Sequence, residues 1–529
     1  MNTVPLDMEA LAGLDTENFI KFPFWPCGPD IYDSIAFQNM DFLFELYDSL
    51  SGTERTLMQL VFRQLFMDFN FFACDFADVF ITKKAGKKPV CGKNSIIYKG
   101  ITDDSLKMVP PSMALDRKSF MGKIKDILRP IVKKRSVMDA IRGAGTPLHF
   151  TNGLTKMIAG YCHENSLPEP CTIPNYFFGH APSLSFRLSG AEKLSAAIAD
   201  GWEKIIFSVT GARLSEHYSE YIKGMAAYYI SWGLRDIVRK CPFKLNNSAF
   251  FCGTGGGYWN RLISLKVQKA GGRVIRMDHG GERPFFADKW WGLNEFVFCD
   301  EFVTFSSAGA LQIKKNLESV YRTLLDSPGN LEVRTINEKS FSILAAKYAG
   351  LPPGNDAPGS VMLVPSGFMG EFNPVPSFTI PDVPYAVFQA KIVEGLKNAG
   401  LDVFYKQAPK AARDCLFGPE KYGAKVVRGF LAECLDMPDA FLFTFCGTAF
   451  CETLCTNKVV VLIEAPPERQ MLPEQKKEIR SACRVVRGSL GADNIQSVNM
   501  EELLHAFREP LSTTELEARR VFRKKWLLQ

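Results

Sequence analysis

The sequence lacks several signatures that would assign a compartment or a function directly. No uninterrupted apolar segment is long enough to span a bilayer. The fourteen cysteines are never spaced C-x-x-C and lie within apolar runs, so we expect reduced thiols and not a disulfide scaffold. The N-terminal residues are acidic, without a basic-then-apolar leader. These features predict a cytoplasmic protein.

Metal and nucleotide motifs are also missing. The six histidines lack ligand spacing and Asp-x-Asp does not occur, so we expect no metal site. There is no Gly-Lys-Ser/Thr P-loop and no G-x-G-x-x-G dinucleotide fingerprint. The net charge of +6 is small for 529 residues, and no RNA- or DNA-binding signature accompanies it. Nucleic acid is therefore not an expected partner.

What the sequence does contain is an alternation of apolar strand-like runs with helical periods. With 46% hydrophobic and 23% charged residues the composition is that of a globular protein, and the length suggests two or three domains. Strands alternating with helices predict an α/β fold with parallel sheets. Residues 1 to about 50 read as an irregular lead-in, and Glu301–Phe305 as the last strand of the first domain.

The predicted organisation has four parts. The first domain spans 1–345 and carries helical insertions. A Pro- and Gly-rich stretch, LPPGNDAPGS, places a hinge at 346–360. The second domain spans 361–510, and a charged helix at 511–529 is expected to pack back on the first domain.

The stretch from Ser248 to Ser307 predicts a strand, a glycine turn, a helix and a second strand. Ligands bind where the strands of such units end. The turn can bring its amides close to an anionic or sugar ligand, or it is a structural tight turn. The candidate ligand contacts are Gly253, Thr254, Gly255 and Gly256, with Asn260 and Arg261 in the first helical turn.

The second strand of that unit delivers a histidine to the same edge. His279 lies between Asp278 and two glycines. Imidazole titrates near neutrality and can take a hydroxyl proton or donate to a phosphate, so His279 is the candidate catalytic base; the alternative is a structural histidine. Asp278 and Glu282 are the nearby carboxylates, which either orient the imidazole or act as the base in its place.

A strand in the second domain runs into a helix through a small-residue turn, DAFLFTFCGTAFCE. Exposed amides at that helix start suit a phosphate, although Thr448 reads equally as a plain N-cap. Glu452 either accepts hydrogen bonds from ligand hydroxyls or is a solvated helix residue. The candidate ligand contacts of this domain are Ser366, Gly367, Lys406, Gln407, Cys446, Gly447, Thr448 and Glu452.

Two further segments are basic, at 83–88 and 117–135. One interpretation is a solvated face. The other is contact with an anionic membrane surface or an acidic carrier.

Together these residues resemble the GT-B glycosyltransferases, and more narrowly the bacterial transferases of capsule and lipopolysaccharide synthesis. The resemblance spans roughly 248–463 and is carried by GTGGGYWNR, RMDHGGERPFF with DEFVTFSSAGA, and DAFLFTFCGTAFCETLCTNKVVVLIE. It implies two Rossmann-like domains facing a central cleft. It also implies a cytoplasmic enzyme, peripheral at the inner membrane, that moves a sugar from a nucleotide-sugar to a glycan or lipid-linked acceptor by displacement without a metal.

The donor implied by the resemblance is a CMP-linked keto-sugar first and a UDP-sugar next. Relatives that use CMP-linked keto-sugars carry Lys-Pro-His-Pro where this chain reads KQAP at 406–409, so the donor histidine is missing. The nucleotide-sugar is a co-substrate, and no other cofactor is expected. The alternatives are a nucleotide-sugar epimerase of the same fold and a non-catalytic scaffold in polysaccharide assembly.

Overall fold

The computed structural model of the chain describes most of its residues. These are 3–14, 21, 24–107, 147–150, 155–168, 170–173, 182–183, 185–241, 245, 248–253, 255–278, 280–287, 289–325, 330–336, 340–349, 358–368, 381–407, 414–467 and 471–528.

The first domain is built on a six-stranded parallel sheet. Its spatial order is β4-β3-β5-β6-β7-β8, which is the doubly wound order of flavodoxin-like sheets. The prediction that Glu301–Phe305 is the last strand was wrong, because the short polar segment EVRT forms one more edge strand. The strands are β3 (Leu148–Phe150), β4 (Cys171–Ile173), β5 (Ala249–Cys252), β6 (Arg273–Met277), β7 (Glu301–Thr304) and β8 (Glu332–Thr335).

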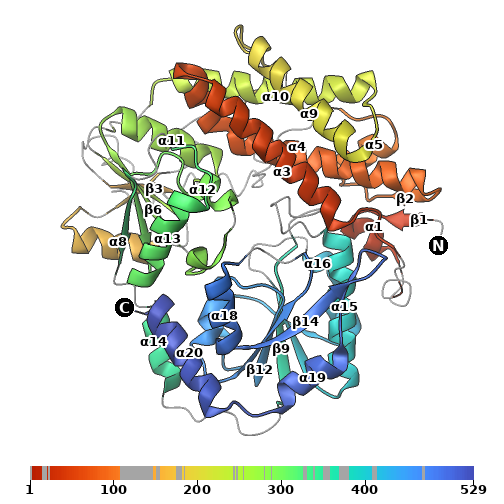
Figure 1. The fold of residues 1–529 in the computed structure, drawn as a ribbon, viewed down its shortest axis with the longest axis vertical. Coiled ribbons are helices and arrows are strands. Elements are labelled where there is room, and N and C mark those ends of the chain that lie inside the picture. The colour runs from red at the N-terminus through yellow and green to blue at the C-terminus, as the bar shows by residue number, and fades with distance from the viewer. Residues whose placement is uncertain are drawn as a thin grey trace, which may run out of the picture.

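Helices cover this sheet and extend beyond it, as Figure 1 shows along the top of the molecule. Residues 29–49 are helical, so the predicted irregular lead-in was wrong there; Pro29 stands at N1, and buried residues recur at helical spacing behind the turn-forming segment. The helices of this domain are α1 (Met8–Ala12), α3 (Pro29–Ser49), α4 (Gly52–Lys84), α5 (Ile96–Thr102), α8 (Thr155–Glu164), α9 (Glu192–Thr210), α10 (Glu216–Val238), α11 (Tyr258–Lys269), α12 (Trp290–Glu295) and α13 (Ser307–Ser319). Helix α14 (Ser340–Ala349) lies beside α20 (Thr513–Trp526), and its Lys347 and Tyr348 donate to Asp436 of the second domain. A two-stranded parallel pair, β1 (Thr3–Pro5) and β2 (Lys88–Val90), lies beside α4.

The second domain has a seven-stranded sheet in the order β11-β10-β9-β12-β13-β14-β15. Counted along the chain, its six parallel strands run 3-2-1-4-5-6, the Rossmann order; only β15 is antiparallel. Two doubly wound parallel sheets confirm the predicted α/β class. The strands are β9 (Ser360–Val364), β10 (Asp402–Lys406), β11 (Lys425–Val427), β12 (Ala440–Phe443), β13 (Val459–Glu464), β14 (Arg484–Leu490) and β15 (Gln496–Val498), and the helices are α15 (Asp382–Asn398), α16 (Asp414–Phe417), α17 (Thr448–Leu454), α18 (Pro473–Ala482), α19 (Met500–Arg508) and α20 (Thr513–Trp526).

Helix α20 bridges the two domains. Arg519 fixes it to the second domain, because its buried guanidinium donates to the carbonyls of Ala482 (3.0 Å) and Lys458 (2.7 Å). At its other end Trp526 meets Phe285 of the first domain edge to face, with ring centroids 5.5 Å apart. A buried hydrophobic cluster therefore runs through both domains. The predicted hinge at 346–360 was wrong at its start, because 346–349 form the end of the helix Ser340–Ala349; residues 350–357 lie outside the described residues.

Candidate functional site

The carboxyl ends of the two sheets frame the candidate site. In a doubly wound sheet, ligands bind where the strand order reverses, outside the carboxyl ends of the strands. That point lies between β9 and β12 in the second sheet. Ser366 follows β9 and Thr444 follows β12, so both residues stand at this reversal.

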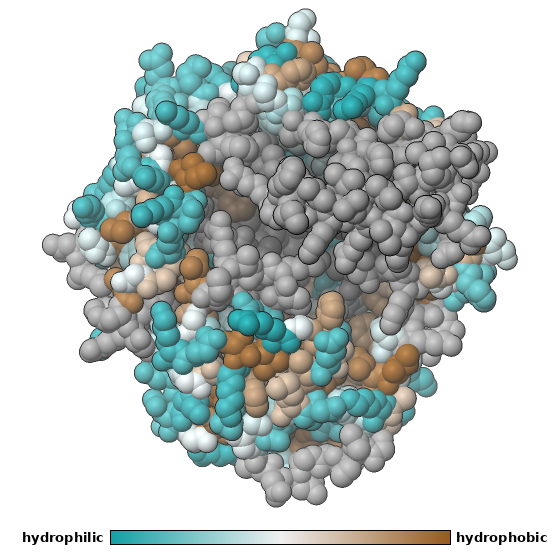
Figure 2. All heavy atoms as spheres, turned by 180° about the vertical axis from the view of Figure 1, so that it is seen from behind, coloured by the Kyte–Doolittle hydropathy of each residue, from teal (hydrophilic) through white to brown (hydrophobic). Residues whose placement is uncertain are grey.

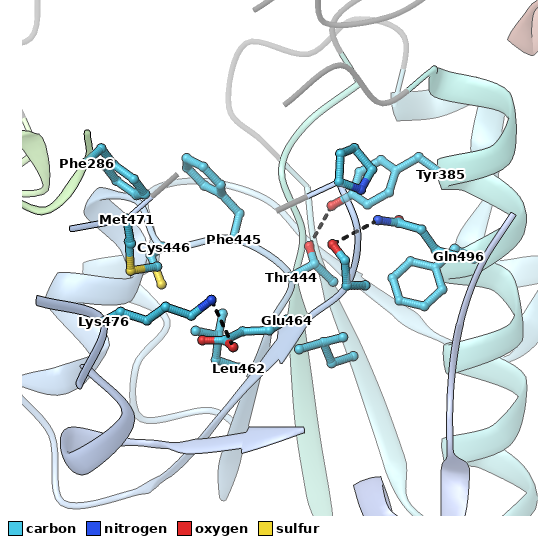
Figure 3. A pocket seen from close by; sticks show the side chains of 14 residues that line it. Phe286, Tyr385, Thr444, Phe445, Cys446, Leu462, Glu464, Met471, Lys476 and Gln496 are labelled. Carbon is cyan, nitrogen blue, oxygen red and sulfur yellow. Dashed lines mark hydrogen bonds and ion pairs between the residues drawn. The ribbon is translucent and has the colours of Figure 1, made fainter. Parts of the chain in front are cut away.

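A pocket occupies the reversal point (Figure 3). It is a shallow, partly open pocket, and the space that it spans, open solvent included, is about 550 Å³. Phe286 of the first domain forms one wall, and the second domain forms the rest. The lining residues are Phe286, Tyr385, Phe388, Thr444, Phe445, Cys446, Leu462, Ile463, Glu464, Ala465, Pro467, Met471, Lys476 and Gln496. Aromatic walls with a few polar groups are typical of small-molecule sites.

Three hydroxyl and amide groups are linked on one side of the pocket. The Tyr385 hydroxyl lies 2.6 Å from Thr444 Oγ1 and accepts from the Ser366 amide at 2.9 Å. Figure 3 shows Tyr385 and Thr444 pointing toward one another. Ser366 was predicted from the sequence, whereas Tyr385 and Thr444 were missed. Tyr385 lies in the first turn of α15, and nothing in its local sequence distinguishes it from a core aromatic.

A buried carboxylate stands at the carboxyl end of β13, on the floor of the pocket. Glu464 accepts from Arg480 Nε at 3.2 Å, and Lys476 Nζ lies 3.7 Å from its other oxygen. Both cations come from α18, which packs against β14 and α20. The ion pairs offset the cost of burying the carboxylate. Sequence reasoning missed Glu464, although a glutamate directly after an apolar strand was the available signal.

Directly after β6, Asp278 and residues 280–282 form a tight loop in the first domain, which we call the carboxylate loop. Asp278 is fully buried; its Oδ1 accepts from the amides of Gly280 and Gly281, both at 3.1 Å, and its Oδ2 accepts from Thr304 Oγ1 at 3.0 Å. Burial and the neighbouring Glu282 raise the pKa of Asp278. With one oxygen bound to amides of the loop and the other to Thr304 of β7, Asp278 holds the loop in shape and fixes it to the neighbouring strand.

Glu282 follows in the same loop and is paired with a cation. Arg283 Nη1 donates to Glu282 Oε1 at 2.6 Å, and Arg283 Nη2 lies 3.3 Å from Glu295. The Arg283 guanidinium also stacks on Trp291, 3.4 Å from the ring centroid. The two carboxylates raise the pKa of Arg283 even though burial lowers it. Arg283 therefore places a positive charge directly against Glu282.

The carboxylate loop lies directly against the second domain. A Cβ built on Gly280 would fall 2.6 Å from Thr448 Oγ1, so only glycine lets the two segments approach this closely. The next residues continue the contact, because Leu472 N donates to the Phe285 carbonyl at 2.9 Å and Phe286 pairs with Met471. The structure thus brings the loop of Asp278 and Glu282 in the first domain against Thr448 of the second, which the sequence had placed in separate domains.

Two predicted residues, His279 and Thr254, lie outside the described residues. The rest of the glycine turn is described, and its packing explains the glycines. A Cβ on Gly255 would fall 2.6 Å from the Asn294 carbonyl, and one on Gly256 would fall 3.0 Å from Arg63 Nε. Close packing within the protein thus accounts for these two glycines, as expected for a structural tight turn. Gly253 and Asn260, at the two ends of the segment, stay partly exposed.

Arg261 does not have the predicted ligand role in this structure. Its side chain is fully buried and donates to three backbone carbonyls, those of Gly255 (2.6 Å), Gln59 (3.0 Å) and Leu293 (3.0 Å). These bonds tie the glycine turn to α4 and α12. The sequence indicated a cation near the turn. It did not indicate where the Arg261 side chain points, because two of the three carbonyls come from distant segments.

The predicted residues at the end of β10 are partly engaged. Lys406 is buried and donates to the carbonyls of Gln407 (3.0 Å) and Gly429 (2.6 Å). The third N–H group of its ammonium could donate to a ligand. Burial lowers the pKa of Lys406. Gln407 Oε1 accepts from Arg428 at 3.0 Å, so its amide is held beside the strand end.

Glu452 lies on α17 within the electrostatic reach of Lys406. Burial raises the pKa of Glu452 to about 7, although the Lys406 charge opposes the rise. A carboxyl that titrates near neutrality is typical of functional sites.

At the start of α17, Gly447 is the N-cap and Cys446 is buried. The helix has only seven residues, so its dipole is a small part of any ligand attraction. Gly367 is half-buried after Ser366.

Comparison with known proteins adds one weak likeness. No protein-family model matches the chain, and no curated protein matches it in sequence. Among solved structures, it overlaps a variant of S. aureus TarM in complex with fondaparinux, α-GlcNAc-glycerol and UDP, at 9% identity and a TM-score of 0.30. The overlap covers 54% of this chain and about half (53%) of the other. An overlap of this quality does not establish the family.

Two general properties complete the description. Within the described ranges, no three His, Cys, Asp or Glu side chains gather in a way that could hold a metal ion. In the same part of the chain, no helix combines the length and apolar character needed to cross a bilayer.

Proposed function

We propose that the protein is a glycosyltransferase that moves a sugar from a nucleotide-sugar donor to a glycan or lipid-linked acceptor. The observation that supports this most directly is the pocket at the reversal point of the second sheet, which Phe286 closes from the first domain. A site shared by two doubly wound domains suits a reaction with two substrates, because each domain can hold one of them.

The donor sugar fits the pocket better than the nucleobase does. Phe286 directly follows the carboxylate loop, so whatever fills the pocket lies next to the groups that would activate an acceptor. Hydroxyls at Tyr385 and Thr444 and the carboxylate of Glu464 can bind sugar hydroxyls, while Phe445 offers an apolar face. The nucleoside would then extend toward Lys406 and Glu452, with Thr448 beside the leaving phosphate.

The reaction would be a direct displacement without a metal. His279 or Glu282 accepts the proton of an acceptor hydroxyl, and the acceptor oxygen bonds to the anomeric carbon of the sugar. The bond from that carbon to the phosphate oxygen breaks, and its electron pair leaves on the phosphate. Lys406 and Thr448 stabilise this charge in a partly desolvated site. A CMP-linked keto-sugar is the first donor to test and a UDP-sugar the second, with capsule or lipopolysaccharide glycans as acceptors.

Nucleotide binding is the first test. We expect one of CMP, UDP, GDP and CDP to raise the melting temperature by several degrees, because a ligand at about 100 times its Kd adds about 2.7 kcal/mol of stability. The double variant Thr448→Val, Lys406→Met should lose this shift. The control Lys421→Met removes an exposed lysine of the same domain and should keep it. If no nucleotide stabilises the protein, a non-catalytic scaffold becomes the better interpretation.

Turnover separates the remaining alternatives. Incubation with the stabilising nucleotide-sugar should release free nucleotide only when an acceptor glycan is added. Conversion of the donor sugar without an acceptor would identify an epimerase instead. The variants His279→Ala and Glu282→Gln should each retain the nucleotide shift, and the one that removes the base should lose transfer by about 100-fold or more.

A further inference from the structure

The end of α4 and the segment that follows it form a basic surface on the first domain. Residues 83–107 contain seven lysines and two aspartates, with no arginine, glutamate or histidine. Their net charge of +5 compares with +6 for the whole chain. We call this region the lysine surface; its exposed lysines are Lys83, Lys84, Lys88, Lys93, Lys99 and Lys107.

Two carboxylates from outside the segment offset part of the charge of the lysine surface, because Asp7 accepts from the Gly92 amide at 2.6 Å and Glu9 accepts from the Asn94 amide at 3.1 Å. Lys83 donates to the Thr102 carbonyl at 3.1 Å, and the Lys87 ammonium lies 3.8 Å from the Phe24 ring centroid. In the part of the chain that the structure describes, these six exposed lysines form no ion pair with a carboxylate. Lysines elsewhere often do, as at Lys347 and Lys525. Unpaired like charges on one surface sum to a positive potential.

Two aliphatic side chains project from the same surface. Ile96 is 54% exposed and Val90 is 38% exposed, although large hydrophobic residues are rarely this open in the described chain. Ile96 and Lys99 are three residues apart on α5 and therefore share one helix face. The other face of α5 is fixed, because the buried Tyr98 donates to Asp78 at 2.8 Å. The exposed face is thus presented on a rigid base.

Lysines around exposed aliphatic side chains match one kind of partner. Anionic lipid headgroups attract the ammonium groups, and the aliphatic side chains can enter the boundary between headgroups and acyl chains. A nucleic acid would be drawn by the charge but has no use for Ile96 and Val90, whereas an acidic protein partner would use both and would leave anionic vesicles unbound. Figure 2 views the molecule from behind and shows the side that carries β2 and α5, at the left, as mostly hydrophilic with isolated hydrophobic residues.

We propose that the lysine surface docks the first domain on an anionic membrane. The predicted basic segment 117–135 lies outside the described residues, so the proposal stands on residues 83–107 alone. Docking goes beyond the proposed glycosyl transfer and does not depend on it. If that function also holds, docking would place the first domain where a lipid-linked acceptor resides.

Vesicle co-sedimentation tests the proposal on the full chain. Wild-type protein should bind vesicles containing about a third phosphatidylglycerol but not vesicles of phosphatidylcholine alone. Raising the salt from about 0.1 M to 1 M should release it, because the Debye length falls from about 10 Å to about 3 Å. Each lysine near the surface contributes roughly fivefold to binding, so removing four should weaken it by at least about 100-fold.

The variants are matched for charge. The test variant neutralises four residues of the lysine surface, and the control neutralises four exposed lysines elsewhere on the first domain. The substitutions are Lys84→Gln, Lys88→Gln, Lys93→Gln and Lys99→Gln in the test, and Lys193→Gln, Lys204→Gln, Lys240→Gln and Lys269→Gln in the control. Equal binding by both variants would overturn the proposal, as would binding to an oligonucleotide without binding to anionic vesicles.

A second pair of variants tests the aliphatic contribution. Ile96→Ser should weaken vesicle binding severalfold, whereas Val238→Ser, at a site that is 78% exposed, should leave it unchanged. All these positions are exposed, so thermal unfolding should stay as in the wild type. The nucleotide-induced shift, measured without vesicles, should also persist in the lysine variant. Loss of vesicle binding and loss of nucleotide binding are therefore separate outcomes.

Discussion

Replacing Glu452 by Gln should remove a pH dependence from the stability of the protein. Burial raises the pKa of Glu452 to about 7, compared with 4.5 for an exposed glutamate. The native state therefore binds a proton more tightly than the unfolded state, and stability falls as pH rises from 4.5 through 7. Glutamine has no proton to lose, so the variant lacks this fall.

The magnitude is set by the size of the shift. A shift of about 2.5 pKa units corresponds to about 3.4 kcal/mol between the fully protonated and fully ionised limits. About three quarters of this lies between pH 5 and pH 8, because the unfolded carboxyl is already mostly ionised at pH 5. The free energy of unfolding of Glu452→Gln, relative to the wild type, should therefore rise by about 2.5 kcal/mol over that range.

Urea unfolding followed by circular dichroism at pH 5, 6, 7 and 8 measures this difference, provided the slope with urea is unchanged. Other titrating groups act equally in both proteins and cancel in the comparison. Glu45→Gln, on the exposed side of α3, is the matched control and should show no pH-dependent difference. Parallel wild-type and Glu452→Gln curves, within about 0.5 kcal/mol, would refute the reasoning.

Two further predictions concern packing. Gly255→Ala should destabilise the first domain by about 1–3 kcal/mol, because the new Cβ would fall 2.6 Å from the Asn294 carbonyl; Gly257→Ala, whose nearest neighbour is 3.5 Å away, should cost much less in the same thermal unfolding assay. Trp526→Ala should cost about 3–5 kcal/mol by removing the buried ring that meets Phe285, while the exposed Lys524→Ala should change little. Equal melting temperatures within either pair would contradict the packing described.

Part of the candidate site could be predicted from the sequence because strand ends are local features. The apolar run before Asp278 predicts a strand, and a parallel strand delivers the residues at its carboxyl end to the ligand edge of the sheet. The same logic located Ser366 after β9 and Thr448 after β12. It worked because hydrophobic periodicity and glycine turns depend on neighbours within a few residues.

Side-chain direction and long-range partners could not be predicted in this way. From the sequence, Arg261 is predicted to be a ligand cation. In the structure it donates to three backbone carbonyls, one of them on the distant helix α4. Tyr385 and Glu464 join the pocket only because β9, β12 and β13 lie side by side in an order that is not the chain order.

The sequence by itself determined the alternation of strands and helices, the class of the fold and the segments that reach the ligand edges. Only the tertiary structure decided which of those edges face one another. Gly280 meets Thr448 because α20 and the buried cluster around Phe285 hold the two domains together. That contact joins residues about 170 positions apart, a separation over which local periodicity carries no information.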